Sequence, residues 1–195
     1  MSTEHSKRLN WESVRNFIRN SWRDDARLFL IAAIIVVFDQ WTKALVRANV
    51  PLGGDWLPAS LAWLMPFARI RHWSNTGAAF GFFQQGSLVF TILAVIVSAV
   101  IIYYFPDVSR RDPWLRLAMG ILLGGSLGNL VDRLTFAGQV TDFISVGNFA
   151  VFNVADGSIT VGVILLVLTA WISDRAEKKR VLAPKTPSEP EVKGE

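Results

Sequence analysis

The sequence contains no cysteine and only two histidines, and these absences restrict the chemistry that the chain can perform. Without cysteine there is no disulfide, no thiolate metal site and no cysteine nucleophile. His5 lies in a polar N-terminal stretch, which leaves His72 as the one imidazole available as a base. A histidine-rich metal site is excluded, and no second partner set supports a Ser/His/Asp arrangement. We therefore expect neither a metal nor a cofactor.

Charge is scarce inside four long apolar runs, although 51% of the 195 residues are hydrophobic. The runs cover approximately residues 28–46, 88–105, 115–131 and 152–171. Each is long enough to cross a hydrocarbon core of roughly 30 Å as a helix. The sequence predicts an all-α membrane protein with four transmembrane helices. The net charge of +4 then reflects membrane topology and not nucleic-acid binding, because the basic residues cluster beside the apolar runs.

Lysine and arginine gather in the N-terminal segment, in the loop between the second and third runs, and after the fourth run. Positive charge favours the inner side of a membrane, so both termini are expected to be cytoplasmic. Residues 47–87 and 132–151 are then outside. The first apolar run is long and carries Asp39, so we do not expect a cleavable signal peptide.

Three regions follow from this pattern. Residues 1–27 form a cytoplasmic extension in which apolar residues from Trp11 onward recur at helical spacing opposite arginines. This spacing predicts an amphipathic helix on the inner membrane surface, or else a plain cytoplasmic helix. Residues 28–173 form the membrane domain. Residues 174–195 form a charged tail that we expect to be disordered.

The long outer loop has a strand-like segment. Residues 67–73 alternate apolar and polar side chains, and a turn signal follows at residues 75–77. We expect a small β-structured outer segment, anchored at the membrane interface by Trp56, Trp63 and Trp73. A plain connecting loop is the alternative.

Four aspartates lie in or near the ends of the apolar runs: Asp39, Asp132, Asp142 and Asp156. At 1.5 Å of rise per residue, Asp39 lies roughly 16 Å, Asp132 roughly 26 Å and Asp156 roughly 22 Å from the inner end of its helix. Asp142 lies in the outer loop between two of these helices. The four carboxyl groups should therefore gather on the outer side. Asn129 and Asn153 each precede an aspartate by three residues, which favours one buried helix face.

Converging carboxylates are the hallmark of aspartic peptidase chemistry, in which two close carboxyl groups share a proton and activate water. Other interpretations remain open. Asp39 could form a structural ion pair with Lys43. The aspartates could also serve an ion-coupled transporter, although four helices without an internal repeat are few for a carrier. A non-catalytic assembly factor is a third possibility. Glycines at 120, 124 and 128 are expected to serve helix packing.

Five sequence blocks carry a more specific resemblance. They are Asp39-Gln-Trp-Thr-Lys43, Asn75-Thr-Gly-Ala-Ala-Phe-Gly81, Gly124-Gly-Ser-Leu-Gly-Asn-Leu-Val-Asp-Arg133, Val140-Thr-Asp-Phe-Ile144 and Phe152-Asn-Val-Ala-Asp156. In this order, around four spans, the blocks resemble the lipoprotein signal peptidase family, also called signal peptidase II. The resemblance covers residues 28–173 approximately.

This resemblance implies a membrane aspartic endopeptidase of the bacterial inner membrane, with Asp142 and Asp156 as the catalytic pair. It further implies that the site is shaped by Asp39, Lys43, Asn75, Gly77, Asn129, Asp132, Arg133 and Asn153. The implied substrates are prolipoproteins, cut just before a cysteine that already carries diacylglyceryl. No metal is implied. We also expect contact with membrane lipid, a monomeric enzyme and inhibition by globomycin.

The sequence departs from the family pattern between the two catalytic blocks. The stretch from Asp142 to Asp156 is shorter than the family leads us to expect, and Ser145 stands where a second acidic or polar residue is usual. Asp132 is therefore the alternative partner of Asp156, and Asp142 is the preferred one.

Overall fold

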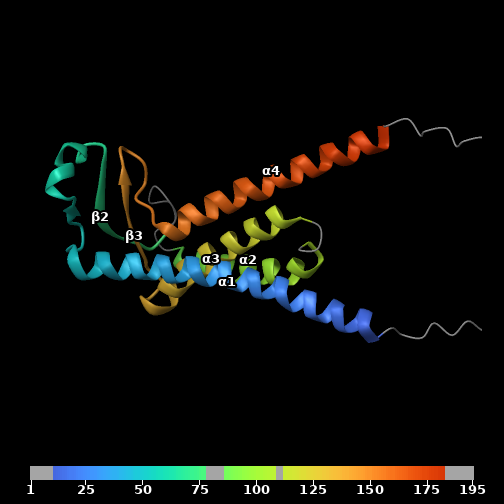
Figure 1. Cartoon of the computed structure of the whole chain (residues 1–195). Helices are drawn as coiled ribbons and strands as arrows, with labels where there is room; N and C mark the ends of the chain where they lie inside the picture. The colour runs from blue at the N-terminus through green and yellow to red at the C-terminus, as the bar shows by residue number, and fades with distance from the viewer. Residues whose placement is uncertain (1–10, 78–85, 109–111, 183–195) are drawn as a thin grey trace, which may run out of the picture.

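A computed structural model describes residues 11–77, 86–108 and 112–182. Its elements, in chain order, are α1 (Trp11–Asn49), β1 (Asp55–Trp56), η1 (Ala59–Leu64), β2 (Ala68–Asn75), α2 (Ser87–Val108), α3 (Pro113–Thr135), β3 (Val140–Val146) and α4 (Val154–Leu182). The sheet lies at one end of the molecule, beside the last turns of α1, whereas the start of α1 and the end of α4 lie at the other end (Figure 1). The predicted fold class is confirmed.

Among the described residues, four helical stretches are long and apolar enough to span a membrane: Ala26–Asn49, Ser87–Phe105, Pro113–Thr135 and Val154–Ala176. The third is central, because α1, α2 and α4 all pack against α3. More than half of its span (56%) is buried, against 17–22% for the other three. Large apolar side chains of the outer helices remain exposed in the isolated chain, as lipid-facing surfaces require.

The glycine-rich face of α3 allows α1 and α4 to approach closely. A Cβ atom at Gly124 would lie 2.7 Å from the Cβ of Ile35, and one at Gly125 would lie 2.6 Å from the carbonyl oxygen of Ala155. At Gly128 an added Cβ would lie 2.8 Å from Oδ2 of Asp39. The interpretation of these glycines as packing residues is confirmed.

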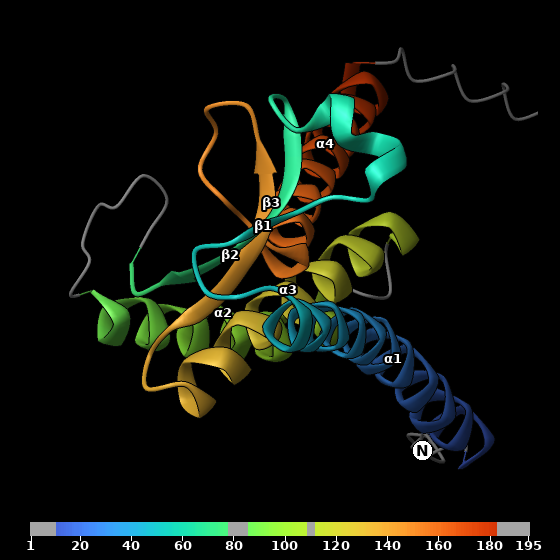
Figure 2. The same cartoon turned by 90° about the vertical axis from the view of Figure 1, so that its left-hand side faces the viewer.

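The three strands form one antiparallel sheet in the order β1-β2-β3. Strand β2 covers most of the segment predicted from alternation, and its register places Trp73 opposite Asp142 and Asn75 opposite Val140. The sequence predicts only a loop over residues 132–151, whereas the structure has strand β3 at Val140–Val146. Six of the seven β3 residues are buried or half-buried, so the strand lacks the alternation of a half-exposed strand. Figure 2 shows the sheet lying across the end of the bundle.

Helix boundaries differ from the prediction at four points. Helix α2 continues past Pro106 to Val108. Helix α4 starts at Val154 because Phe152 pairs with Ile144 as an extra bridge beside β3. It continues to Leu182, so residues 174–182 of the predicted disordered tail are helical. Residues 11–27 belong to α1 without a break, and their placement on the membrane surface stays a prediction.

Candidate functional site

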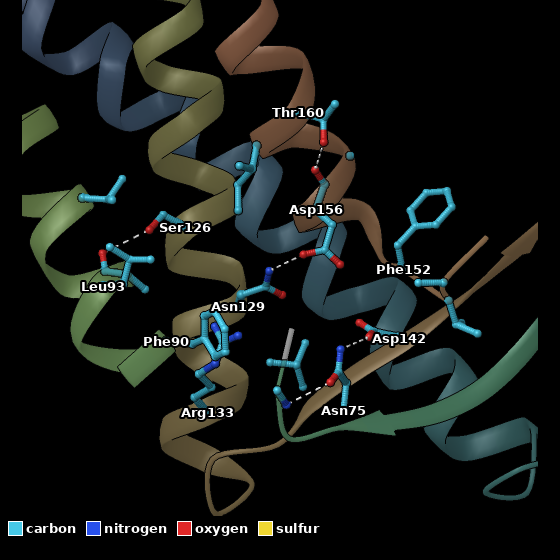
Figure 3. A pocket seen from close by; sticks show the side chains of 18 of the residues that line it. Asn75, Phe90, Leu93, Ser126, Asn129, Arg133, Asp142, Phe152, Asp156 and Thr160 are labelled. Carbon is cyan, nitrogen blue, oxygen red and sulfur yellow. Dashed lines mark hydrogen bonds between the residues drawn. The ribbon is translucent and has the colours of Figure 1, made fainter. Parts of the chain in front are cut away.

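A cavity of about 700 Å³ opens between α2, α3 and α4, directly beneath the sheet. Its walls toward the membrane are apolar, with Phe90, Leu93 and Val97 from α2 facing Ile159 and Val161 from α4. Its end near the sheet is polar. That end is lined by side chains from four elements: Asn75, Asn129, Arg133, Asp142 and Asp156 (Figure 3). The cavity can therefore hold an apolar chain with a polar group at one end.

Asp142 is held on β3 by amide groups from two other segments. Its Oδ2 accepts a hydrogen bond from Asn75 Nδ2 at 2.9 Å, and its Oδ1 accepts one from Asn153 Nδ2 at 2.6 Å. Asn75 is itself fixed, because its Oδ1 accepts the N–H of Gly77 at 2.9 Å. Only 1% of Asp142 is exposed. The carboxylate therefore has a defined orientation at the polar end of the cavity.

Asp156 lies in the first turn of α4, where it forms a reciprocal cap with Asn153. The Asn153 Oδ1 accepts the N–H of Asp156 at 3.0 Å, and Oδ2 of Asp156 accepts the N–H of Asn153 at 3.1 Å. This is a capping box, and the start of a helix also favours a negative charge. The spacing of three between Asn153 and Asp156 thus marks a helix start and not a shared helix face.

Asn129 connects the two carboxylates from the α3 side. It donates from Nδ2 to Oδ1 of Asp156 at 2.7 Å, and its Oδ1 accepts from Asn153 Nδ2 at 3.1 Å. Asn129 shares a buried face of α3 with Asp132, as predicted, because Lys43 contacts both side chains, and its amide also donates across to α4. Asn153 contacts both Asp142 and Asn129, so a continuous set of amide groups joins Asp142 to Asp156.

The environment of Asp142 favours its protonated form. Burial, followed by repulsion from the charge of Asp156, raises the pKa of Asp142 from 3.8 to about 7, although hydrogen bonds from Asn75 and Asn153 oppose the rise. A carboxyl group that holds a proton near neutral pH beside a second carboxylate can act as a general acid while its partner accepts a proton.

A buried ionic cluster lies behind the cavity, between α1 and α3. Lys43 contacts Asp39 Oδ2 at 2.8 Å and Asp132 Oδ2 at 3.3 Å, and the three side chains are fully buried. The Asp39–Lys43 ion pair that the sequence allowed as an alternative is present. Asp132 does not line the cavity and is engaged by cations and backbone. Asp142, in contrast, lines the cavity.

Three further residues of this cluster were missed in the sequence. Gln40 Nε2 donates to Asp132 Oδ1 at 2.9 Å, and Arg47 Nη1 donates to Thr141 Oγ1 at 2.9 Å. The guanidinium of Arg47 also lies 4.5 Å from the centre of the Phe136 ring. One signal was present, because Arg47 follows Lys43 by four residues and so shares its helix face. Thr141 gave no signal apart from its position next to Asp142.

The chain is similar to known proteins over most of its length. A family model described as "Signal peptidase (SPase) II" (Peptidase_A8) matches residues 31–172. The lipoprotein signal peptidase of Shouchella clausii (strain KSM-K16) is 38% identical over 152 residues, which cover 77% of this chain and 97% of the relative. That of Enterococcus faecalis (strain ATCC 700802 / V583) is 34% identical, with coverage of 77% and 91%.

Similarity extends to solved structures. One, described as "Bacterial membrane enzyme structure by the in meso method at 2.3 A resolution", superposes with a TM-score of 0.67 at 30% identity and covers 84% of this chain and 94% of that one. Another, solved at 1.9 Å, gives a TM-score of 0.64 at 31% identity, with coverage of 74% and 92%. The chain belongs to the signal peptidase II family of membrane aspartic peptidases.

Proposed function

We propose that this chain removes signal peptides from diacylglyceryl-modified bacterial prolipoproteins, with Asp142 and Asp156 as the catalytic pair. The observation that carries the proposal is the cavity itself. One end holds two carboxylates that are connected by hydrogen bonds through asparagine side chains, and the rest is an apolar groove between α2 and α4. The groove suits an apolar peptide segment and a lipid chain. The carboxylates suit hydrolysis of the bond at its polar end.

The pair would act on a water placed between its members. One carboxylate accepts a proton from the water as the water oxygen attacks the carbonyl carbon of the residue before the lipidated cysteine. The protonated partner donates its proton to the carbonyl oxygen, which gives a tetrahedral diol. The carboxyl group that accepted the water proton then protonates the amide nitrogen, while its partner takes back a proton from a diol hydroxyl. The C–N bond breaks, and the signal peptide leaves with a new carboxyl terminus. The proton belongs to the pair, so neither aspartate is assigned permanently as acid or base.

The remaining predicted site residues support this chemistry from defined positions. Asn75 and Asn153 hold Asp142, and Asn129 holds Asp156. Arg133 and Gly77 line the same cavity, where the cation can face a substrate carbonyl and the glycine leaves room for the peptide. Asp39, Lys43 and Asp132 act from behind, without access to substrate. Strands β1 and β2 would cover the bound peptide.

We place the enzyme in the inner membrane as a monomer with both termini in the cytoplasm. The start of α1 and the end of α4 lie on the side of the molecule away from the sheet (Figure 1). Arg27 belongs to the first of these segments, and Arg175 and Lys178 belong to the second, which favours the cytoplasm for this side. This orientation opens the carboxylates toward the outer leaflet. Globomycin should block cleavage, and an undiminished rate at saturating globomycin would contradict a site of this family type.

The test is cleavage of a diacylglyceryl-modified prolipoprotein by purified protein. Asp142→Asn and Asp156→Asn should abolish cleavage. Asp132→Asn should keep measurable activity, because a carboxamide oxygen still accepts the N–H of Thr141. Asp174→Asn is the matched control, since Asp174 is an exposed aspartate paired with Lys178 far from the cavity. Activity in Asp142→Asn with loss in Asp132→Asn would reassign the pair, and failure of the wild type to cleave would reject the proposal.

A further inference from the structure

Lys43 occupies a position that the catalytic chemistry does not use. Its ammonium group is fully buried, 2.8 Å from one carboxylate of α1 and 3.3 Å from one of α3. It also donates to Oδ1 of Asn129 at 3.1 Å. Burying these charges is costly unless their geometry is closely fixed. The cluster therefore holds three helix-borne groups at one point.

The two carboxylates of this cluster, Asp39 and Asp132, each also accept a hydrogen bond from a backbone N–H group. Oδ1 of Asp39 accepts the backbone N–H of Ala155 at 2.9 Å, and Oδ2 of Asp132 accepts the backbone N–H of Thr141 at 2.8 Å. Ala155 directly precedes Asp156, and Thr141 directly precedes Asp142. Each carboxylate thus accepts the backbone N–H of the residue that precedes one member of the proposed catalytic pair.

Two further side chains, Gln40 and Arg47, reinforce these hydrogen bonds. Gln40 Nε2 lies within hydrogen-bonding distance of both carboxylates, 3.2 Å from Asp39 Oδ2 and 2.9 Å from Asp132 Oδ1. Arg47 adds a hydrogen bond to the hydroxyl of Thr141. The cluster therefore connects the backbone beside Asp156 to the backbone beside Asp142 through Asp39, Lys43 and Asp132. None of these three side chains lines the cavity.

We propose that Lys43, by holding Asp39 and Asp132 together, sets the separation of Asp142 and Asp156. Lys43 is then a positioning residue and not only a countercharge for buried carboxylates. The same contact with Asn129 keeps that amide from turning over, because an ammonium group can only donate and so requires the amide oxygen. The Asn129 amino group is left facing Asp156. The inference rests on the proposed catalytic pair.

The separation can be measured without activity, since the chain has no cysteine of its own. The variant Asp142→Cys/Asp156→Cys places two thiols at the pair, and a short reagent that joins two thiols reports their proximity. Adding Lys43→Met should slow the cross-linking severalfold. Lys178→Met is the matched control, because it removes an i,i+4 ion pair of similar length, 2.7 Å, at an exposed site. Equal rates in the two backgrounds would overturn the proposal.

A charge-neutral variant guards against simple unfolding. In Lys43→Met/Asp39→Asn/Asp132→Asn no buried charge is left unpaired within the triad, and both carboxamides can still accept the backbone N–H groups. Its melting temperature should stay near that of the wild type, while kcat falls about 100-fold and KM changes little. Unchanged kcat in this folded variant would overturn the positioning role. Cleavage that survives Asp142→Asn or Asp156→Asn would instead reject the catalytic pair, and the cross-linking result would still stand alone.

Discussion

At the scale of single residues, Asn153 carries two duties that can be separated. Its side-chain oxygen caps α4, and its amino group donates to Asp142 and Asn129. A cap needs only an acceptor, whereas orientation of the carboxylate needs the donor. One asparagine thus connects helix stability with site geometry.

Asn153→Ser should separate these duties, because serine caps helices but has no amide donor for Asp142. We expect stability near that of the wild type and a kcat lowered by about 100-fold or more. Asn153→Ala should lose activity to the same extent and also about 1 kcal/mol of stability. Thermal unfolding in detergent and prolipoprotein cleavage measure the two effects. Equal stability of both variants would show that the cap contributes nothing.

The raised pKa of Asp142 gives a direction for pH dependence. Because the folded-state value of about 7 lies above the ordinary 3.8, the protonated form is favoured by folding. The contribution of Asp142 to stability is complete below pH 3.8, falls as pH rises, and is lost above about 7. Unfolding measured across this range should show that slope in the wild type, and the slope should be smaller in Asp142→Asn.

The same pKa predicts that cleavage declines above pH of about 7, when the shared proton is lost. Asn75→Leu removes a hydrogen bond that lowers the pKa of Asp142, so the alkaline limb of the pH–rate profile should move to higher pH. Asp174→Asn should leave the limb in place. A limb that moves to lower pH in Asn75→Leu would contradict the assigned role of Asn75.

At the scale of elements, α3 depends on its glycines for contact with α1. Gly124→Ala places a methyl group 2.7 Å from Ile35 Cβ and 3.0 Å from the Ala32 carbonyl oxygen, and should cost about 1–3 kcal/mol. Gly157→Ala is the matched change in α4, where nothing lies within 4 Å of the added methyl group. It should be neutral or stabilising by about 0.4–1 kcal/mol. Thermal unfolding of the two variants compares them, and equal losses would contradict close packing at Gly124.

Elements that show a local sequence pattern could be predicted, whereas features that depend on contacts between distant residues could not. The four helices follow from apolar runs, and β2 follows from alternation in residues 67–73. Strand β3 could not, because Thr141, Asp142 and Ser145 are polar yet buried by β2 and α1. The gathering of aspartates on the outer side was predicted from helix rise. The hydrogen-bond partners of these aspartates could not be predicted. The hydrogen bond from the Ala155 N–H to Asp39, for example, joins residues 116 positions apart.

At the scale of the whole molecule, the sheet lies at one end, and the start of α1 and the end of α4 lie at the opposite end (Figure 1). The absence of cysteine makes the topology directly measurable. In intact spheroplasts a membrane-impermeant maleimide should label Ser60→Cys in η1, and should label Lys178→Cys in α4 only after permeabilisation. The opposite pattern would invert the proposed orientation.

The central place of α3 bears on how the protein enters the bilayer during synthesis. The end of α3 next to the sheet carries Asn129, Asp132 and Arg133. Inserting these polar groups into lipid without partners is energetically costly. Helix α1 is made first and carries Lys43, the partner of Asp132. The third segment thus finds its countercharge already in the membrane, and α4 follows with Asp156, which accepts a hydrogen bond from Asn129 of α3. The order of synthesis thus provides each polar segment with a partner when it enters the bilayer. A circular permutant with α1 moved to the C-terminus should therefore insert poorly.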